Sequence, residues 1–482
     1  MNKHDIFALL NIPNDFSINI DDIIDDPDSF TRYVYLSRPA VPTFCPECGC
    51  IMHSKGIKVR TVNHPIYQDN TRLILKVSQR RWKCTGCSLS YNEEYPFLER
   101  YKRNSNLTPL LVLEAMKDLN RTAVSIAEQF NISDSEVHDL FSQYVDLKRL
   151  PLPECISIDE VYFNISANEL YAFVIMDFST GEIVDIVHNR WSNTLEDYFK
   201  RIPKEERNNV KYVISDAYSP YKILIKRFFP SAEHILDSFH VVKLINSKIS
   251  LYINEVLKKY RQKQKKQLEE KNMLTNRDYE TIKDSEEIIL LRDYRWVLLK
   301  DVENINYSLK RYYHKKLGMY LDTYQIEQMF FAIDDKFKRI RDLKEMYIRF
   351  NSASYEDSNM IGKQLDEIIA TYKKCELDMF IEFASTLEEF RDYIIASFKT
   401  VKRINKGQRK GHYEVITRLS NGPMEGFNRK PKDYKRNSRG FSNFDYTRNR
   451  ILWSNRINPP VLAVPKKLKE IHIYHRKKKN KD

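Results

Sequence analysis

Two aspartates in this 482-residue sequence stand at the ends of apolar, strand-like runs. Asp159 ends the run Ile156-Ser-Ile-Asp159, and Asp216 directly follows Tyr212-Val-Ile-Ser215. Carboxylates at the ends of adjacent strands can share divalent metal ions through their oxygen atoms. Two such ions, about 3.5–4 Å apart, activate an attacking oxygen and stabilise the leaving oxygen during phosphodiester transfer. A single strand-end aspartate often only forms a turn, so the pair carries the prediction.

A third acid is expected on a helix. The segment Ser420-Asn-Gly-Pro423 is a turn and helix-start signal, which places Glu425 in the first helical turn. Asn428, Arg429 and Lys432 follow at helical spacing and share its face. We predict that Glu425 binds metal with the two aspartates while the cations hold phosphate oxygens. The alternative is a glutamate placed at a helix N-terminus for its favourable interaction with the helix dipole.

The segment 153–245 must position the two aspartates. Strand-like runs occupy Ile156–Asp159, Leu170–Met176, Glu182–Val187, Tyr212–Ser215 and His234–Leu236, and helical runs occupy Thr194–Arg201 and Tyr218–Phe229. Ser179-Thr180-Gly181 predicts a hairpin turn between the second and third strands. A three-stranded meander followed by alternating helix and strand indicates a mixed sheet covered by helices, with the Asp159 strand in its centre.

The segment 241–420 separates the second acid from the third. It contains no proline and only four glycines, and its apolar residues recur at helical spacing. We therefore expect a long all-helical segment. Within it, Arg295-Trp296 could stack an unpaired base of a DNA end, although a core tryptophan is the commoner role of such a residue.

Four of the seven cysteines form two pairs, Cys45-Pro-Glu-Cys48 and Cys84-Thr-Gly-Cys87. Four thiolates at this spacing close a tetrahedral shell around zinc, and a shell without an open position is structural. The pattern predicts a zinc ribbon, and the alternative is two unrelated cysteine pairs. The other three cysteines are unevenly placed, which favours a reducing compartment over a disulfide framework.

Candidate DNA-contacting residues occur beside these motifs. Arg80, Arg81 and Lys83 precede the second cysteine pair and suit phosphate contact. Helical runs at Leu107–Leu119, Ala123–Phe130 and Ser133–Tyr144 follow, and the last pair resembles a helix-turn-helix. The last run opens with the capping-box pattern of a serine followed three residues later by a glutamate. Recognition would fall on Ser135, Glu136 and His138, and a plain helical hairpin is the alternative.

The net charge of +13 is unevenly distributed. Residues 421–482 hold 17 Lys and Arg against 5 Asp and Glu, whereas the first 30 residues hold seven Asp and one Lys. A basic end of this kind predicts a polyanionic partner, and a solvated, solubilising surface is the alternative. One of the longest apolar runs, Tyr171-Ala-Phe-Val-Ile-Met176, ends at an aspartate, so we expect no membrane span. The acidic first residues predict no export signal.

A set of motifs resembles the ISL-three family of bacterial insertion-sequence transposases. The motifs are Ser157-Ile-Asp159-Glu, Val213-Ile-Ser-Asp216-Ala-Tyr, Asp237-Ser-Phe-His240-Val-Val-Lys243, Ser420-Asn-Gly-Pro-Met-Glu425-Gly-Phe-Asn428, Lys435-Arg436 and Gly440-Phe-Ser-Asn-Phe444. The resemblance runs from the cysteine pairs to about Trp453. It implies a ribonuclease-H-like catalytic domain of the DDE type whose triad is Asp159, Asp216 and Glu425. It also implies a helical insertion between the second and third acids.

Asp237 and His240 occupy a D-x-x-H motif that follows the second acid in related transposases. We interpret both as supporting the active site, with Asn428, and Asp237 is the rival for the second carboxylate. The family usually continues the helix that carries the glutamate, whereas Pro431 interrupts it here. Proline lacks an N–H and clashes with the preceding turn, so we expect a kink or a short helix. This affects the predicted roles of Lys432, Lys435 and Arg436, which follow Pro431, more than that of Glu425.

The predicted fold class is multidomain α/β. The expected divisions are an N-terminal segment (1–40), a zinc ribbon (41–98), a helix-turn-helix domain (105–148), a ribonuclease-H-like core (153–245), a helical insertion (246–410), the last part of the core (411–460) and a basic tail (461–482). The predicted function is binding of the terminal inverted repeats of an insertion sequence, with metal-dependent cleavage and strand transfer by two magnesium ions. Because two ends must be joined, a homodimer or larger synaptic complex in the bacterial cytoplasm, at the nucleoid, is expected. The alternatives are an inactive, transposase-derived regulator and a nuclease without strand transfer.

Overall fold

The computed structural model describes residues 7–12, 15, 17–68, 71–166, 169–270, 284–355, 357–407, 411–438 and 443–471. The chain forms two compact units. The first contains Met1–Leu150, Val161–Ala172 and Asn428–Asp482, and the second contains Pro151–Glu160 and Phe173–Phe427. No helix among the described residues is long and apolar enough to span a bilayer.

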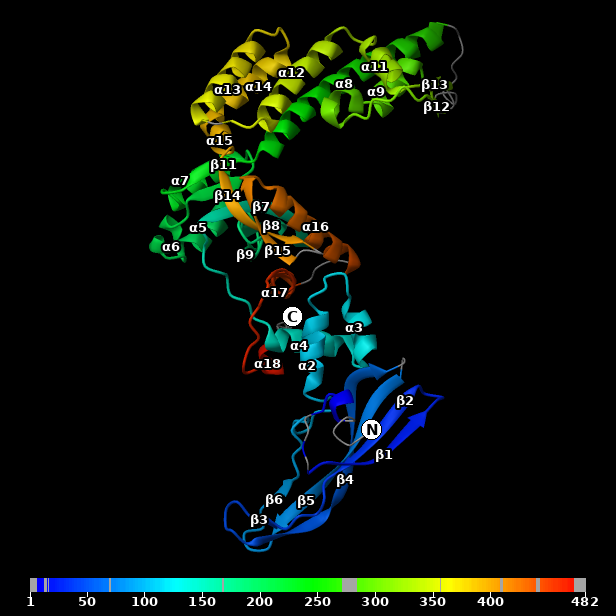
Figure 1. Ribbon diagram of the computed structural model, residues 1–482, viewed down its shortest axis with the longest axis vertical. Helices are drawn as coiled ribbons and strands as arrows, with labels where there is room; N and C mark the ends of the chain where they lie inside the picture. Colours follow the sequence, from blue (N-terminus) through cyan, green and yellow to red (C-terminus); the bar gives the residue numbers. More distant parts are fainter. Residues whose placement is uncertain are drawn as a thin grey trace, which may run out of the picture. The chain divides into compact units, whose positions relative to one another are not determined.

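The first unit begins with a six-stranded sheet (Figure 1). Its strands are β1 (Asn19–Asp26), β2 (Thr31–Ser37), β3 (Thr43–Phe44), β4 (Ile51–Gln68), β5 (Thr71–Cys84) and β6 (Ser90–Asn92), in the order β1-β2-β5-β4-β3 with β6 also on β5. Alternate residues of β2 and β5, such as Val34, Leu75 and Val77, are fully buried. Because β2 pairs in parallel with β5, the acidic N-terminal residues belong to the same sheet as the cysteine region.

Helices follow the sheet in the first unit. They are α2 (Leu107–Ala115), α3 (Ala123–Phe130), α4 (Asp134–Tyr144), α17 (Phe444–Asn455) and α18 (Leu468–Ile471). The turn between α3 and α4 places Asn131 in the left-handed region, with φ of 53°. The helix predicted over Leu107–Leu119 ends earlier, at Ala115, whereas α3 has the predicted bounds. Trp453 of α17 donates a hydrogen bond of 2.8 Å to the Leu113 carbonyl, so residues far apart in sequence complete this helical group.

A five-stranded sheet contains the segments that carry the aspartates. Its strands are β7 (Cys155–Ser166), β8 (Glu169–Asp177), β9 (Ile183–Val187), β10 (Tyr212–Ser215) and β11 (Glu233–Leu236), in the order β11-β10-β7-β8-β9. The central position of β7 confirms the sequence prediction. β7 continues to Ser166, however, so Asp159 lies within the strand and not at its end. In the second unit this sheet is accompanied by α5 (Ser192–Lys200), α6 (Lys204–Asn208) and α7 (Ser219–Phe228).

The segment after β11 is largely helical. It contains α8 (Ser238–Glu270), α9 (Glu286–Asp293), α10 (Trp296–Leu299), a short 3₁₀ turn (Val302–Asn304), α11 (Thr323–Phe331), α12 (Lys336–Ser352), α13 (Ser358–Lys373), α14 (Asp378–Glu389) and α15 (Arg391–Ala396). Four of these helices, α8, α12, α13 and α14, pack side by side (Figure 1). The aromatic side chains of Tyr347, Tyr372 and Phe383 are fully buried between them. Burial of large apolar side chains is the main source of stability for such a bundle.

The prediction that residues 241–420 are all helical is wrong at two hairpins. β12 (Tyr312–His314) pairs with β13 (Met319–Leu321), and β14 (Thr400–Gly407) pairs with β15 (Gly411–Arg418). Gly318, with φ of 73°, lies just before the second strand of the first hairpin. Gly411, with φ of 67°, begins the second strand of the other hairpin. β14 also bonds to the β8–β9 turn, because the Ile404 N–H donates to the Ser179 carbonyl at 2.7 Å. Such tertiary pairing overrides the local helical pattern.

Candidate active site

Three aspartates lie level with one another on neighbouring parallel strands. Ser157 of β7 pairs with Ile214 of β10, and Ser215 of β10 pairs with Leu236 of β11. Continuing this register by one or two residues aligns Asp159, Asp216 and Asp237. The Asp237 N–H donates to the Ser215 carbonyl at 3.0 Å, which extends the ladder to that aspartate. Three carboxylates therefore gather along one line across the sheet.

Glu425 joins this group from a helix. α16 (Gly422–Asn437) begins after the Ser420-Asn-Gly-Pro423 turn, and Glu425 is in its first turn, as the sequence predicts. Among the described residues, ligand atoms of Asp237, His240 and Glu425 all lie within 4.8 Å of one another. The structure thus brings the glutamate to the D-x-x-H motif at the start of α8.

The ligand atoms of this group suit a divalent cation. Asp237 Oδ2 and His240 Nε2 are buried, and neither has a hydrogen-bond partner in the described part of the chain. They are 3.8 Å apart, too far for a hydrogen bond between them. A buried polar atom without a partner costs free energy, and a cation coordinated by carboxylate oxygens and an imidazole nitrogen would remove that cost.

Asp159 and Asp216 face the same region. Burial, with a smaller contribution from the Asp216 carboxylate, raises the pKa of Asp159 to about 6, although the hydrogen bond from the Glu160 N–H and the charge of His240 oppose this shift. Burial also raises the pKa of Asp237. Ionised acids held in such surroundings repel one another, and a bound cation inverts that effect. The interactions of Asp159 with Asp216 and His240 link the two predicted aspartates to His240, which also lies near Glu425.

Asn421 is a positioning residue. It belongs to the Ser420-Asn-Gly-Pro423 motif, but no role was predicted for it from the sequence. Its backbone N–H donates to Asp237 Oδ1 at 3.1 Å, and its side-chain amide donates to the Ile158 carbonyl at 3.2 Å. Its side chain is fully buried. One residue therefore ties the start of α16 to both β7 and the end of β11. The asparagine between a serine and a Gly-Pro pair was the available sequence signal.

Replacing Asn421 by alanine should destabilise the second unit. The change leaves the Ile158 carbonyl buried without its donor, which costs about 1–3 kcal/mol. Chemical denaturation of the variant, followed by circular dichroism, measures the loss in free energy of unfolding. Ser420→Ala changes the neighbouring side chain as a matched control and should cost much less. Equal losses in the two variants would contradict the role given to Asn421.

A second polar network surrounds Glu160, the residue after Asp159. The Tyr221 hydroxyl donates to Glu160 Oε1 at 2.5 Å, and Arg190 forms an ion pair with the other carboxylate oxygen. The network ties β7 to α7 and to the segment after β9. No role was predicted from the sequence for these side chains.

Helix α16 corrects the expectation about Pro431. The helix extends through Pro431 to Asn437, so a short helix is wrong. Asn428 is buried in the first unit, one helical turn after Glu425. Arg429 and Lys432 are exposed, Lys435 lies 4.6 Å above the Tyr162 ring, and Arg436 pairs with Asp433 at 3.1 Å. Gly440 to Ser442 of the last family motif lie outside the described residues, as does the end of the basic tail from residue 472.

The four paired cysteines come together at one end of the first sheet. Sulfur atoms of Cys45, Cys48, Cys84 and Cys87 all lie within 4.8 Å of one another. The Cys84 thiol accepts hydrogen bonds from the backbone N–H groups of Gly86 and Cys87, and its pKa falls to about 6. A thiolate so favoured is a good metal ligand. The cluster can therefore hold a metal ion with tetrahedral sulfur ligands.

The predicted DNA-contacting residues of the first unit differ in availability. Arg81 and Ser135 are exposed, Lys83 is half-buried, and Arg80 lies 3.6 Å from Glu93. Ser133 caps α4 by accepting the Glu136 N–H at 3.1 Å. The Glu136 side chain instead accepts from Asn104 at 2.5 Å, so the capping box is only half formed. His138 bonds to the Tyr446 hydroxyl at 2.7 Å, and the Ser135 hydroxyl lies 3.0 Å from that of Ser133.

A row of three aspartates thus runs across a mixed sheet, the last of them lies near a helix-borne glutamate, and a mainly helical segment separates these aspartates from the glutamate in the chain. The family model of ISL-three (ISL3) DDE transposases, described as "Transposase", matches residues 156–451. The chain belongs to this family, as the resemblance of its motifs predicted.

A curated relative agrees with the family. The transposase for insertion sequence element IS1001 of Bordetella parapertussis is 25% identical over 328 residues, which cover 66% of this chain and 72% of the relative. The similarity supports a transposase function for this protein.

Proposed function

We propose that this transposase cuts the ends of an insertion sequence and joins them to target DNA with Asp159, Asp216 and Glu425. The observation that carries the proposal is the alignment of Asp159 in β7 with Asp216 and Asp237, which directly follow β10 and β11, together with the proximity of Glu425 to Asp237. Divalent cations would activate the attacking oxygen and stabilise the leaving oxygen of the phosphodiester. Magnesium suits this role because carboxylate oxygens are its preferred protein ligands.

The protein's own residues then orient the ions and the DNA. Asp159 and Asp216 supply carboxylates from two adjacent strands, and Glu425 supplies one from α16. Asp237 and His240 support the glutamate side of the site, where their ligand atoms meet. Water first attacks a phosphodiester at the element's end, and the freed 3′-hydroxyl then attacks target DNA. Each step is an in-line displacement that needs no covalent protein intermediate.

The first unit is proposed to bind the DNA ends. The four-cysteine cluster would hold a structural zinc ion, because a closed shell of four thiolates leaves no open position for chemistry. The pair α3 and α4, joined by the left-handed turn at Asn131, would act as the helix-turn-helix. Basic residues of α16 and of the segment 461–482 would add salt-sensitive contacts to phosphate. Because two ends are joined in one event, a homodimer or larger synaptic complex is proposed.

The proposal is tested by incubating the purified protein with linear DNA that contains a candidate element end. We expect magnesium-dependent nicks with 3′-hydroxyl ends, followed by joined products when target DNA is added. EDTA should abolish both. Binding without cutting over a range of magnesium and manganese concentrations would favour the inactive regulator, and cutting without joining would favour a nuclease.

The start of α4 offers a separate prediction. Ser135→Glu places a negative charge on an exposed helix start, where it would repel phosphate. We expect roughly tenfold weaker binding to end-containing DNA, since a charge contact of this kind contributes about 1–2 kcal/mol. Ser385→Glu, on the exposed face of α14, is the matched control and should bind normally. Equal affinities in a mobility-shift titration of the two variants would remove α4 from the DNA interface.

A further inference from the structure

A pocket of about 320 Å³ lies beside the β12–β13 hairpin in the second unit. Its walls include four aromatic side chains, Tyr294, Trp296, Tyr312 and His314, and none of its lining residues is acidic. This volume is at the lower end of the range of about 300–1,000 Å³ that small-molecule sites occupy. The pocket is therefore suited to a flat ring of modest size.

The structure fixes two walls of this pocket and leaves a third exposed. The Tyr294 hydroxyl bonds to His314 Nδ1 at 2.7 Å, which joins the end of α9 to the hairpin. Trp296 is half-buried and packs against the core of the insertion. Tyr312, by contrast, is 56% exposed. A half-fixed aromatic pocket with one accessible ring can stack a guest without rebuilding its walls.

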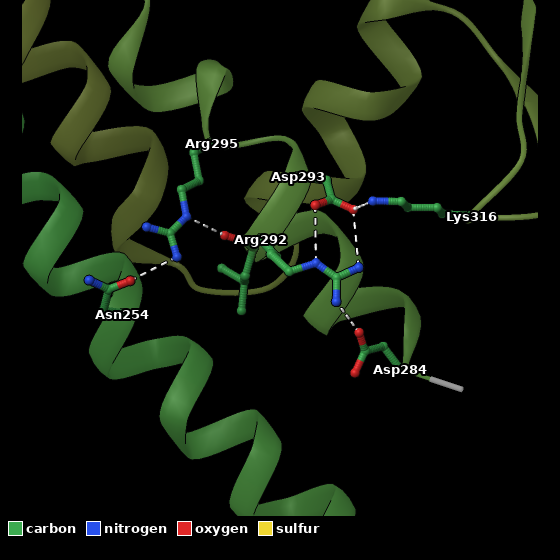
Figure 2. Close-up of polar contacts among 7 residues, drawn as sticks. Asn254, Asp284, Arg292, Asp293, Arg295 and Lys316 are labelled. Carbon is green, nitrogen blue, oxygen red and sulfur yellow. Dashed lines mark hydrogen bonds and ion pairs between the residues drawn. The ribbon is translucent and has the colours of Figure 1, made fainter. Parts of the chain in front are cut away.

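Several cations near the pocket serve the fold, as Figure 2 shows. Arg292 bonds to Asp284 and to both carboxylate oxygens of Asp293, and Lys316 also donates to Asp293 Oδ2, at 2.8 Å. Arg295 donates to Asn254 at 2.7 Å and to the Leu291 carbonyl at 2.9 Å. These contacts use the Arg295 guanidinium to join α9 to α8. Of the Arg295-Trp296 pair considered for base stacking, the tryptophan and its aromatic neighbours therefore remain as the stacking surface.

Other cations around the pocket remain available for a ligand. Lys300, Lys310 and Lys315 are exposed, and none of them has an ion-pair partner among the residues that the structure describes. Lys300 lines the pocket, and the Lys310 ammonium lies 5.3 Å from the centre of the Tyr312 ring. The surface around the exposed aromatic wall is consequently positive. Aromatic rings beside uncompensated cations match a nucleobase and its flanking phosphates.

We propose that this pocket binds one unpaired base of a DNA strand. Tyr312 and Trp296 would stack on the base, and Lys300 and Lys310 would contact the phosphates on either side. Stacking of this kind tolerates any base, because every base has a π-face. The proposal rests on DNA as the substrate of this transposase but not on the carboxylate cluster. It gives the insertion a direct role in holding strands that open at an element's end.

Two neighbouring tyrosines allow a matched test. Tyr312 and Tyr313 are each 56% exposed, but they point to opposite faces of β12. Only Tyr312 lines the pocket, whereas Tyr313 packs on Tyr320 with ring centroids 5.2 Å apart. Both alanine variants of the full chain are titrated, without divalent metal, against a labelled single-stranded oligothymidylate and a fully paired duplex.

Tyr312→Ala should weaken binding of the single strand by about 5- to 30-fold and change duplex binding by less than about twofold. Tyr313→Ala should leave both affinities unchanged. Unchanged single-strand affinity in Tyr312→Ala would overturn the proposal, and so would equal losses in the two variants. Because no metal is present, failure of the cleavage proposal leaves this measurement unaffected.

Discussion

Replacing Asp159 or Asp216 by asparagine should abolish measurable DNA cleavage while leaving binding to the DNA intact. Each carboxylate is proposed to hold a cation whose stabilisation of the transition state is worth several kcal/mol. The loss corresponds to a rate reduction of about 10²–10³-fold or more. Single-turnover cleavage with saturating protein measures the chemical step, and a mobility-shift titration measures binding.

The control for this experiment is another buried aspartate of the same sheet. Asp185 of β9 is 6% exposed and accepts a hydrogen bond from the Tyr198 hydroxyl at 2.9 Å, away from the cluster. Asp185→Asn should cleave DNA at nearly the parent rate. Cleavage by the Asp159 and Asp216 variants at the rate of this control would exclude both residues from catalysis.

Asp159→Asn should also change the free energy of unfolding, which provides a second measurement on this variant. The folded pKa of about 6 lies above the usual value of 3.8, so the folded state binds the proton more tightly than the unfolded chain. Stability contributed by the protonated form is present below pH 3.8 and is lost as pH rises through 6. At neutral pH without metal, Asp159→Asn should therefore be more stable than the parent by about 1–3 kcal/mol.

The second large effect is expected at the cysteine cluster. Cys84→Ser, or removal of the metal with a strong chelator, should unfold the cysteine-bearing end of the first sheet. Structural zinc contributes about 10–16 kcal/mol of apparent binding free energy in small zinc domains, far more than a few short strands supply. We expect loss of one zinc per chain by a colorimetric metal assay and loss of DNA-end binding. Proteolysis near β3 and β6 should become faster.

Two cysteines outside the four provide controls. Cys375 lies in the helical insertion, and Cys50 lies beside the cluster, near Gly86. Serine at either position should leave the zinc content at one per chain. A parent protein that contains no zinc when purified without chelators, or a Cys84→Ser variant that retains it, would contradict the structural role of the metal.

Sequence patterns predicted the sheet and the cysteine cluster because their signals are local. The runs before Asp159 and Asp216 and the turn at Ser179-Thr180-Gly181 correspond to strands and a hairpin in the structure. Two C-x-x-C pairs likewise determine which sulfurs meet. The strand and turn predictions depend on residues within a few positions of one another, whereas the meeting of the two cysteine pairs also requires the long-range pairing of β4 with β5.

The predictions that failed depend on partners far away in the chain. β14 and β15 look helical by composition, but they form a hairpin whose first strand bonds to the Ser179 turn. Of the kink or short helix expected at Pro431, the short helix is wrong, because α16 continues to Asn437. Asp237 and His240 were predicted to support the site that contains Glu425, whereas the bond from the Asn421 N–H to Asp237, which joins the start of α16 to the end of β11, was not predicted.

The most direct test of the carboxylate site is a manganese titration followed by electron paramagnetic resonance. Manganese prefers the same oxygen ligands as magnesium, and thiolate clusters do not favour it. The parent protein is compared with a variant that combines Asp159→Asn, Asp216→Asn and Glu425→Gln. We predict that the parent binds manganese at least tenfold more tightly than the variant. Equal affinities in the two proteins would contradict a shared metal site formed by these three acids.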